Sequence, residues 1–282
     1  MRIDVAGIGI ALEVHEPRSG RRPGDGAEAT ATVLCIHGWP DTRHLWRHQV
    51  GPLTDAGFRV ITPDLRGFGD SDRPARIEDA SIGAHLGDLL GVLDHLGVGR
   101  AHVVGHDWGA ALAWVLATLA PERVDHLVAI SVGHPAAFAA AGLPQREKSW
   151  YMLAFQFAGV AERWLAADDF ANFRAWSAHP DADEVAARLA DPDALAATLA
   201  IYRANVGPES LLAPPPVLPE VAAPTLGIWS TGDMALTEEQ MTGSAAHLTG
   251  PWRYERLEGV GHWIPLEAPE ALNRLLLDFL PR

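Results

Sequence analysis

The chain has 282 residues, of which 48% are hydrophobic and 21% charged, a composition typical of a globular protein with a substantial core. Its net charge of −14 argues against a nucleic-acid partner, because no basic stripe is present to displace phosphate counterions. Cys35 is the only cysteine, which excludes an intrachain disulfide. The sequence has neither a signal-peptide pattern nor an apolar run of membrane-spanning length. We therefore expect a cytoplasmic protein without a membrane partner.

Strand and helix patterns alternate along most of the chain. Apolar runs predict strands over 3–15, 32–36, 58–61, 103–105, 124–132, 224–229 and 252–257. Helical patterns and capping residues predict helices over 42–53, 81–96, 108–121 and 268–279, and a Gly/Pro/Arg-rich loop is expected at 18–26. Strands that alternate with helices of this size indicate βαβ units. The predicted fold class is α/β, with a mostly parallel central sheet flanked by helices.

The alternation stops after Gly133. Residues 134–216 contain helical segments rich in Ala, Trp and Phe and no buried strand. We predict an α/β core formed by residues 1–133 and 217–282, with an inserted helical cap at 134–216.

A Gly-x-Asp-x-Gly motif ends the central predicted strand. Gly105 and Gly109 flank Asp107, and a helical pattern follows at once. This strand–turn–helix context is that of a nucleophile elbow, in which the two glycines let strand and helix backbones pack closely. The commoner version of the motif has serine at its apex, so the sequence predicts a carboxylate nucleophile here.

A carboxylate nucleophile needs a base, an acid to orient that base, and donors for an oxyanion. His262 lies in a Gly-containing loop between the last predicted strand and the final helix. Asp233 follows the preceding strand, and its rivals Glu238 and Glu239 are assigned to a helix capped by Thr237. The chain order nucleophile, acid, histidine is the one expected for this core.

The oxyanion donors are expected to be backbone N–H groups. The first belongs to Trp108, the residue after the nucleophile, and the second to Trp39 in the sequence His37-Gly38-Trp39-Pro40.

These motifs, in this order, resemble the α/β-hydrolase superfamily over essentially the whole chain. Within it they resemble the aspartate-nucleophile group, which contains epoxide hydrolases, haloalkane dehalogenases and fluoroacetate dehalogenases. The resemblance implies that Asp107 attacks an sp³ carbon and forms an alkyl ester. His262, oriented by Asp233, would then activate a water that hydrolyses the ester. It implies no cofactor.

Two tyrosines in the predicted cap favour epoxide hydrolysis. Tyr151 and Tyr202 resemble the two cap tyrosines of epoxide hydrolases, whose phenol hydroxyls can donate to an opening epoxide. The alternative interpretation is that both are packing residues, as Tyr254 on a core strand is expected to be. The side chains proposed for the substrate pocket indicate a small apolar substrate that reacts with water: Trp39, Trp108, Trp150, Phe155 and Phe157.

The predicted reaction is therefore conversion of an apolar epoxide to a vicinal diol, by a monomer or a homodimer. Haloalkane dehalogenase is the alternative, because Trp108 matches a halide-binding tryptophan of that family, although Trp39 stands where many dehalogenases have Asn. Fluoroacetate dehalogenase fits less well, because it has Arg directly after the nucleophile. A non-catalytic homologue that binds a small ligand is the alternative of another class.

No metal site is predicted. His44 and His48 lie four residues apart on a predicted helix, but the sequence supplies neither a third ligand nor a His-Glu-x-x-His motif. An ion pair between Asp64 and Arg66 beneath the active site is a hypothesis that the sequence leaves open.

Overall fold

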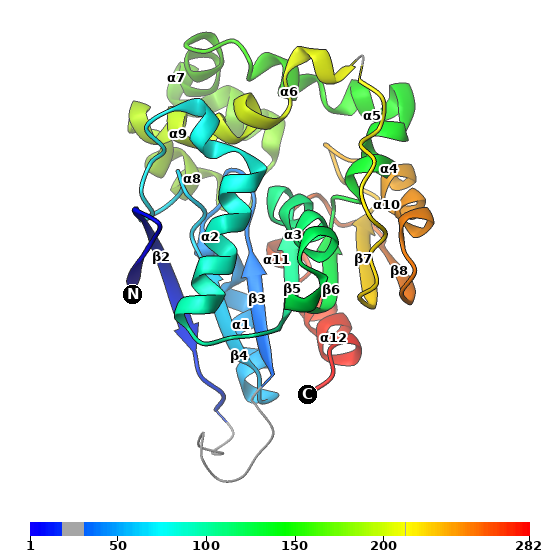
Figure 1. Ribbon diagram of the computed structural model, residues 1–282. Helices are drawn as coiled ribbons and strands as arrows, with labels where there is room; N and C mark the ends of the chain where they lie inside the picture. Colours follow the sequence, from blue (N-terminus) through cyan, green and yellow to red (C-terminus); the bar gives the residue numbers. More distant parts are fainter. Residues whose placement is uncertain (19–30, 212) are drawn as a thin grey trace.

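The computed structural model describes residues 1–18, 31–211 and 213–282, so nearly all of the loop predicted at 18–26 lies outside the described residues. An eight-stranded sheet, with the order β1-β2-β4-β3-β5-β6-β7-β8, forms the centre of the structure (Figure 1). Its strands are β1 (Arg2–Val5), β2 (Ile8–His15), β3 (Thr32–Ile36), β4 (Arg59–Pro63), β5 (Ala101–His106), β6 (Val124–Ile130), β7 (Thr225–Ser230) and β8 (Trp252–Leu257). β1 and β2 run antiparallel to their neighbours and the other six strands are parallel, which confirms the predicted α/β class.

Helices cover both faces of the sheet, as buried parallel strands require. Leu34 and Ile36 of β3 point to one face, where they join a cluster with helices α2 (Ile82–His95) and α3 (Trp108–Leu119). Val33 and Cys35 point to the opposite face, toward α1 (Arg47–Asp55) and α12 (Pro269–Phe279). Because side chains alternate along a strand, one apolar run contributes to the hydrophobic cores on both faces of the sheet.

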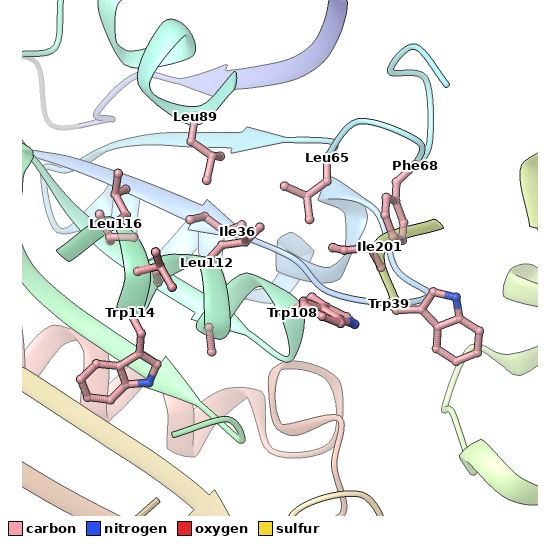
Figure 2. Packing of buried hydrophobic residues seen from close by; sticks show 14 of the residues in the cluster. Ile36, Trp39, Leu65, Phe68, Leu89, Trp108, Leu112, Trp114, Leu116 and Ile201 are labelled. Atoms are coloured by element: carbon pink, nitrogen blue, oxygen red, sulfur yellow. The ribbon is translucent and has the colours of Figure 1, made fainter. Parts of the chain in front are cut away.

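Within the described residues, the chain between β6 and β7 forms helices and no strand. They lie above the carboxyl ends of the parallel strands (Figure 1) and comprise α4 (Pro135–Ala140), α5 (Gly142–Lys148), α6 (Trp150–Ala154), α7 (Val160–Ser177), α8 (Ala182–Leu189), α9 (Pro192–Asn205) and the 3₁₀ helix η4 (Pro208–Leu211). Ile201 of α9 belongs to the same buried cluster as Leu65 and Phe68 of the core (Figure 2). Apolar packing therefore joins these helices to the core. The cap limits at residues 134 and 216 stay a prediction.

The remaining short elements belong to the α/β part of the chain, outside the segment between β6 and β7. They are the α-helices α10 (Glu238–Thr242) and α11 (Ile264–Glu267) and the 3₁₀ helices η1 (Arg43–Trp46), η2 (Ile77–Ala80), η3 (Pro121–Arg123) and η5 (Gly243–His247). In the described part of the chain, no helix is both long and apolar enough to cross a membrane.

The structure differs from the expected local structure at three places. Residues 3–15 form a hairpin of two strands, because Ala6 and Gly7 adopt positive φ and reverse the chain. The helix expected at 42–53 is a 3₁₀ turn followed by α1. Asp64 and Arg66 do not pair with each other: Asp64 binds Arg43, and Arg66 binds Asp88 in a bidentate pair. The sequence spacing did not show that these partners come from other segments.

We expect Gly105→Ala to lower the free energy of unfolding by about 1–3 kcal/mol, the range of overpacked sites. A Cβ on Gly105 would overlap the carbonyl oxygen of Gly109, which is backbone and cannot move aside. Urea unfolding measures the change. Gly87→Ala in α2 is the control, because nothing lies within 4 Å of that Cβ and alanine favours a helix. Equal effects of the two substitutions would contradict the close approach of β5 and α3.

Candidate active site

Asp107 lies at the sharp turn between β5 and α3. Its backbone adopts φ 54° and ψ −124°, a conformation that non-glycine residues rarely adopt and that clusters at functional sites. Gly109 packs against the carbonyl groups of Ile36 and His37 so closely that no Cβ would fit. The turn is therefore held between α3 and the end of β3, and it directs the carboxylate toward the loop that follows β3.

Two backbone N–H groups bind the Asp107 carboxylate. The Trp39 N–H donates to Oδ1 at 2.8 Å, and the Trp108 N–H also hydrogen-bonds to the carboxylate. Burial raises the pKa of Asp107 to about 6, although His262 and these two N–H groups act in the opposite direction. The two donors predicted for an oxyanion thus both bind the carboxylate, with the Trp39 N–H on Oδ1, while Oδ2 is the oxygen that faces His262.

His262 lies between the two carboxylates. Its Nδ1 is 2.9 Å from Asp233 Oδ2, and its Nε2 is 3.7 Å from Asp107 Oδ2. Burial by itself lowers the pKa of an imidazole, but Asp233 and then Asp107 outweigh it and raise the pKa of His262 to about 9. Nδ1–H donates to Asp233, which leaves Nε2 directed toward Asp107.

Asp233 is fixed by its own loop. Its Oδ1 accepts the backbone N–H groups of Ala235 and Leu236, both at 2.9 Å. Burial raises the pKa of a carboxyl group, but His262 and these N–H donors reverse the effect and lower the pKa of Asp233. Asp233 is therefore ionised and acts as an acceptor for His262.

A cavity of about 540 Å³ opens above Asp107. Tyr151 from α6 and Tyr202 from α9 line it together with Asp107 and Trp108, and the two tyrosine ring centroids are 6.0 Å apart. Burial, followed by the Asp107 charge, raises the pKa of both tyrosines well above its usual value. Both hydroxyls are thus protonated donors. The rest of the wall is mainly apolar and includes Val115, Phe138, Met152, Leu153 and Pro216.

The predicted pocket residues separate into three groups. Trp108 lines the cavity, whereas Trp39 and Phe155 are buried behind the tyrosines and pack against Tyr202. Trp150 and Phe157 do not line it and are 43% and 64% exposed, so their assignment to the pocket is corrected. On α6 the neighbouring Tyr151 takes the inward position, and adjacent residues of a helix point about 100° apart.

Three residues that support the site were not predicted from the sequence. His106 donates from Nε2 to the carbonyl oxygen of His262 at 2.9 Å, and its place inside the elbow motif could have indicated it. Gln145 of α5 donates to the Ala235 carbonyl and accepts the Thr237 N–H, both beside Asp233. Lys148 donates to the Asp233 carbonyl. No motif marks Gln145 or Lys148, because their partners lie about 90 residues away.

The chain belongs to the α/β-hydrolase family: residues 31–269 match the sequence profile of the alpha/beta hydrolase fold. Among curated relatives, Epoxide hydrolase A of Mycobacterium tuberculosis is 32% identical over 90% of this chain and 92% of that protein. AB hydrolase superfamily protein YfhM of Bacillus subtilis is 31% identical over 95% of this chain and 94% of that protein.

Solved structures agree with this assignment. An epoxide hydrolase from metagenomes of hot environments aligns with a TM-score of 0.86 and 28% identity, over 100% of this chain and 98% of that one. Epoxide Hydrolase A from Mycobacterium thermoresistibile aligns with a TM-score of 0.80 and 26% identity, over 99% and 97% of the two chains. Within the family, the chain is most like epoxide hydrolases.

His262 gives the stability of the fold a pH dependence. Its pKa is about 9 when folded and about 6.5 when unfolded, so its contribution is complete below about pH 6.5 and is lost as the pH rises through 9. We expect His262 to contribute a fall of ~1.4 kcal/mol per pH unit to the free energy of unfolding between about pH 7 and 8.5. Histidines whose pKa is lowered by burial, such as His85 and His106, act in the opposite direction, so urea unfolding measures the contribution as the difference in slope between the wild type and His262→Gln.

His262→Gln should lack this contribution, whereas His95→Gln, which removes an exposed histidine at the end of α2, should retain the slope of the wild type. Equal slopes in the wild type and in His262→Gln would contradict the raised pKa of His262.

Proposed function

We propose that the protein is an epoxide hydrolase that converts an apolar epoxide to a vicinal diol. The observation that carries this proposal is that one apolar cavity holds a carboxylate nucleophile, Asp107, and two tyrosine hydroxyl donors, Tyr151 and Tyr202. The curated and structural relatives that bear the name epoxide hydrolase support the same reaction.

The first step is attack by the free oxygen of the nucleophile. With Oδ1 engaged by the Trp39 N–H, Asp107 Oδ2 attacks an epoxide carbon, and the C–O bond to the ring oxygen breaks. A hydroxyl of Tyr151 or Tyr202 protonates that oxygen as it leaves. The mainly apolar wall lowers the local dielectric constant, which strengthens the tyrosine hydrogen bonds to the developing alkoxide. The product of this step is an alkyl ester on Asp107.

The second step is hydrolysis of that ester. Esterification removes the Asp107 charge, one of the charges that raise the pKa of His262, so the pKa falls and Nε2 becomes available as a base. His262 then takes a proton from a water that attacks the ester carbonyl carbon. The resulting oxyanion forms on Oδ1, where the N–H groups of Trp39 and Trp108 bind it. When the oxyanion collapses, the bond to the alkyl oxygen breaks, and that oxygen takes the proton from His262 and leaves as part of the diol. The new Asp107 carboxyl group gives up its proton, which returns to the tyrosinate formed in the first step, so that the carboxylate and the tyrosine are both regenerated.

Haloalkane dehalogenation is less well supported. A halide needs N–H donors, and the indole N–H of Trp39 is directed to Thr198 Oγ1 at 3.3 Å. Trp108 does line the cavity, but its indole hydrogen-bonds to Tyr202. A non-catalytic binding role does not account for the buried, hydrogen-bonded pair of His262 and Asp233 next to Asp107.

We expect the double variant Tyr151→Phe/Tyr202→Phe to lose at least ~100-fold in epoxide turnover, because no hydroxyl remains to protonate the leaving oxygen. Diol formation from an aryl epoxide is measured by chromatography. Tyr254→Phe is the matched control: its hydroxyl donates to Glu238 at 2.8 Å and does not line the cavity, so its turnover should be unchanged.

A bromoalkane serves as the second substrate in this assay, because a leaving halide needs no proton. Hydrolysis of the bromoalkane alone, unaffected in the double variant, would identify a dehalogenase. Undiminished epoxide turnover in the double variant would contradict the role of the two tyrosines.

A further inference from the structure

Three potential metal ligands meet at the end of the sheet opposite the active site. His102 is the second residue of β5, and Asp125 and His126 are the second and third residues of β6. One ligand atom from each lies within 4.8 Å of the others. The amino ends of β5 and β6 lie on the side of the sheet away from the cap helices, near α12 and the C-terminus (Figure 1).

A register shift between β5 and β6 brings the three side chains together. Ala101 pairs with Val124 and Val103 pairs with Leu127, so two residues of β6 lie opposite the single residue His102. Neighbouring residues of a regular strand point to opposite faces, and a bulge interrupts this alternation. The bulge therefore allows both Asp125 and His126 to reach the same imidazole.

His102 is held in the orientation that a metal ligand requires. Its side chain is 4% exposed, and its Nε2 donates to the carbonyl oxygen of Pro281 at 2.9 Å. Nδ1 therefore carries the lone pair, and it is buried without a hydrogen-bond partner. It lies 3.2 Å from Asp125 Oδ2, and His126 Nδ1 lies 3.1 Å from the same oxygen. A backbone carbonyl that orients the distal nitrogen is the usual support of a metal-bound histidine.

We propose that His102, Asp125 and His126 bind a divalent transition-metal ion such as Zn²⁺. Two imidazoles and one carboxylate form a ligand set that Zn²⁺ accepts, and ligands about 2.0–2.1 Å from a tetrahedral ion are about 3.4 Å apart. The separations of 3.1 and 3.2 Å are close to that value. Asp125 and His126 are half-buried, so water can supply a fourth ligand. The other oxygen of Asp125 pairs with Arg100.

The proposed ion has a structural role. It would join β5 to β6 and, through His102 and Pro281, hold the end of the chain after α12. The His126 ring also packs edge-on against Phe279 of α12 at 5.5 Å. Asp107 follows the other end of β5, so the ion takes no part in the proposed reaction. The sequence pointed only to His44 and His48 as potential metal ligands. The cluster of His102, Asp125 and His126 could not be predicted, because only the bulge between β5 and β6 brings the three side chains together.

The test uses full-length protein without a histidine tag, freed of metal with EDTA and titrated with Zn²⁺ by calorimetry. We expect one ion per chain and a rise in melting temperature, because an ion that binds the folded state stabilises it. Asp125→Asn and His126→Gln should each weaken binding by at least ~10-fold. Both positions are partly exposed, so the variants should fold, as circular dichroism and unchanged epoxide turnover would verify. Mg²⁺, which prefers oxygen ligands, should not bind.

The matched control is the double variant His44→Gln/His48→Gln, which removes two exposed histidines and should bind Zn²⁺ as the wild type does. Cobalt provides a second readout, because Co²⁺ in a four-coordinate site has strong visible absorption that His126→Gln should remove. Zn²⁺ binding that survives His126→Gln, or that is lost equally in the control variant, would overturn the proposal. The absence of any Zn²⁺ binding by the folded wild type would also overturn it.

Discussion

The close contact of three backbone segments around Asp107 is the constraint on which the rest of the structure depends. The end of β5, the start of α3 and the loop after β3 approach so closely that Gly38, Gly105 and Gly109 leave no room for a Cβ. This packing holds Asp107 at a positive φ and places its carboxylate against the Trp39 N–H. The buried sheet supplies the rigidity for this arrangement, since strained conformations persist only where the surroundings determine them.

The same constraint fixes the electrostatics of the site. Asp107, His262 and Asp233 are all buried; the two carboxylates raise the pKa of His262, and His262 acts to lower the pKa of each carboxyl group. Burial of an unpaired charge is strongly unfavourable. His262 therefore lies between the two carboxylates, and backbone N–H groups bind each carboxylate on its other oxygen. The proposed reaction uses this balance, because esterification of Asp107 removes one charge and thereby lowers the pKa of His262. In the proposed reaction, the arrangement that makes the buried charges tolerable would therefore also prepare His262 as the base for the second step.

The sequence predicted features that depend on local spacing. The elbow motif indicated Asp107, and the loops after successive strands indicated Asp233 and His262. The structure brings these three side chains together, because a parallel sheet places the carboxyl ends of its strands at one edge. Their catalytic roles stay a prediction. The tyrosines were predicted by resemblance, and the structure places both beside Asp107. The helices between β6 and β7 have no comparable regularity. From the sequence of such short helices, one cannot derive which of two adjacent aromatic residues points into the cavity.

Features that arise from long-range packing could not be predicted in this way. Trp150 was expected in the pocket and lies outside it, whereas Gln145 was missed although it holds the loop of Asp233. The cluster of His102, Asp125 and His126 depends on a bulge, which changes side-chain direction without a recognisable sequence signal. Pairing between distant segments, rather than local periodicity, determines each of these features.

The central claim is that Asp107 forms a covalent ester with the substrate. Intact-protein mass spectrometry of His262→Gln after incubation with an aryl epoxide tests it most directly, because removal of the base prevents hydrolysis and the ester accumulates. The account predicts that the protein gains the whole mass of the epoxide and that peptide mapping places the adduct on Asp107. A folded variant that gains no mass, or that carries the adduct on another residue, would contradict it.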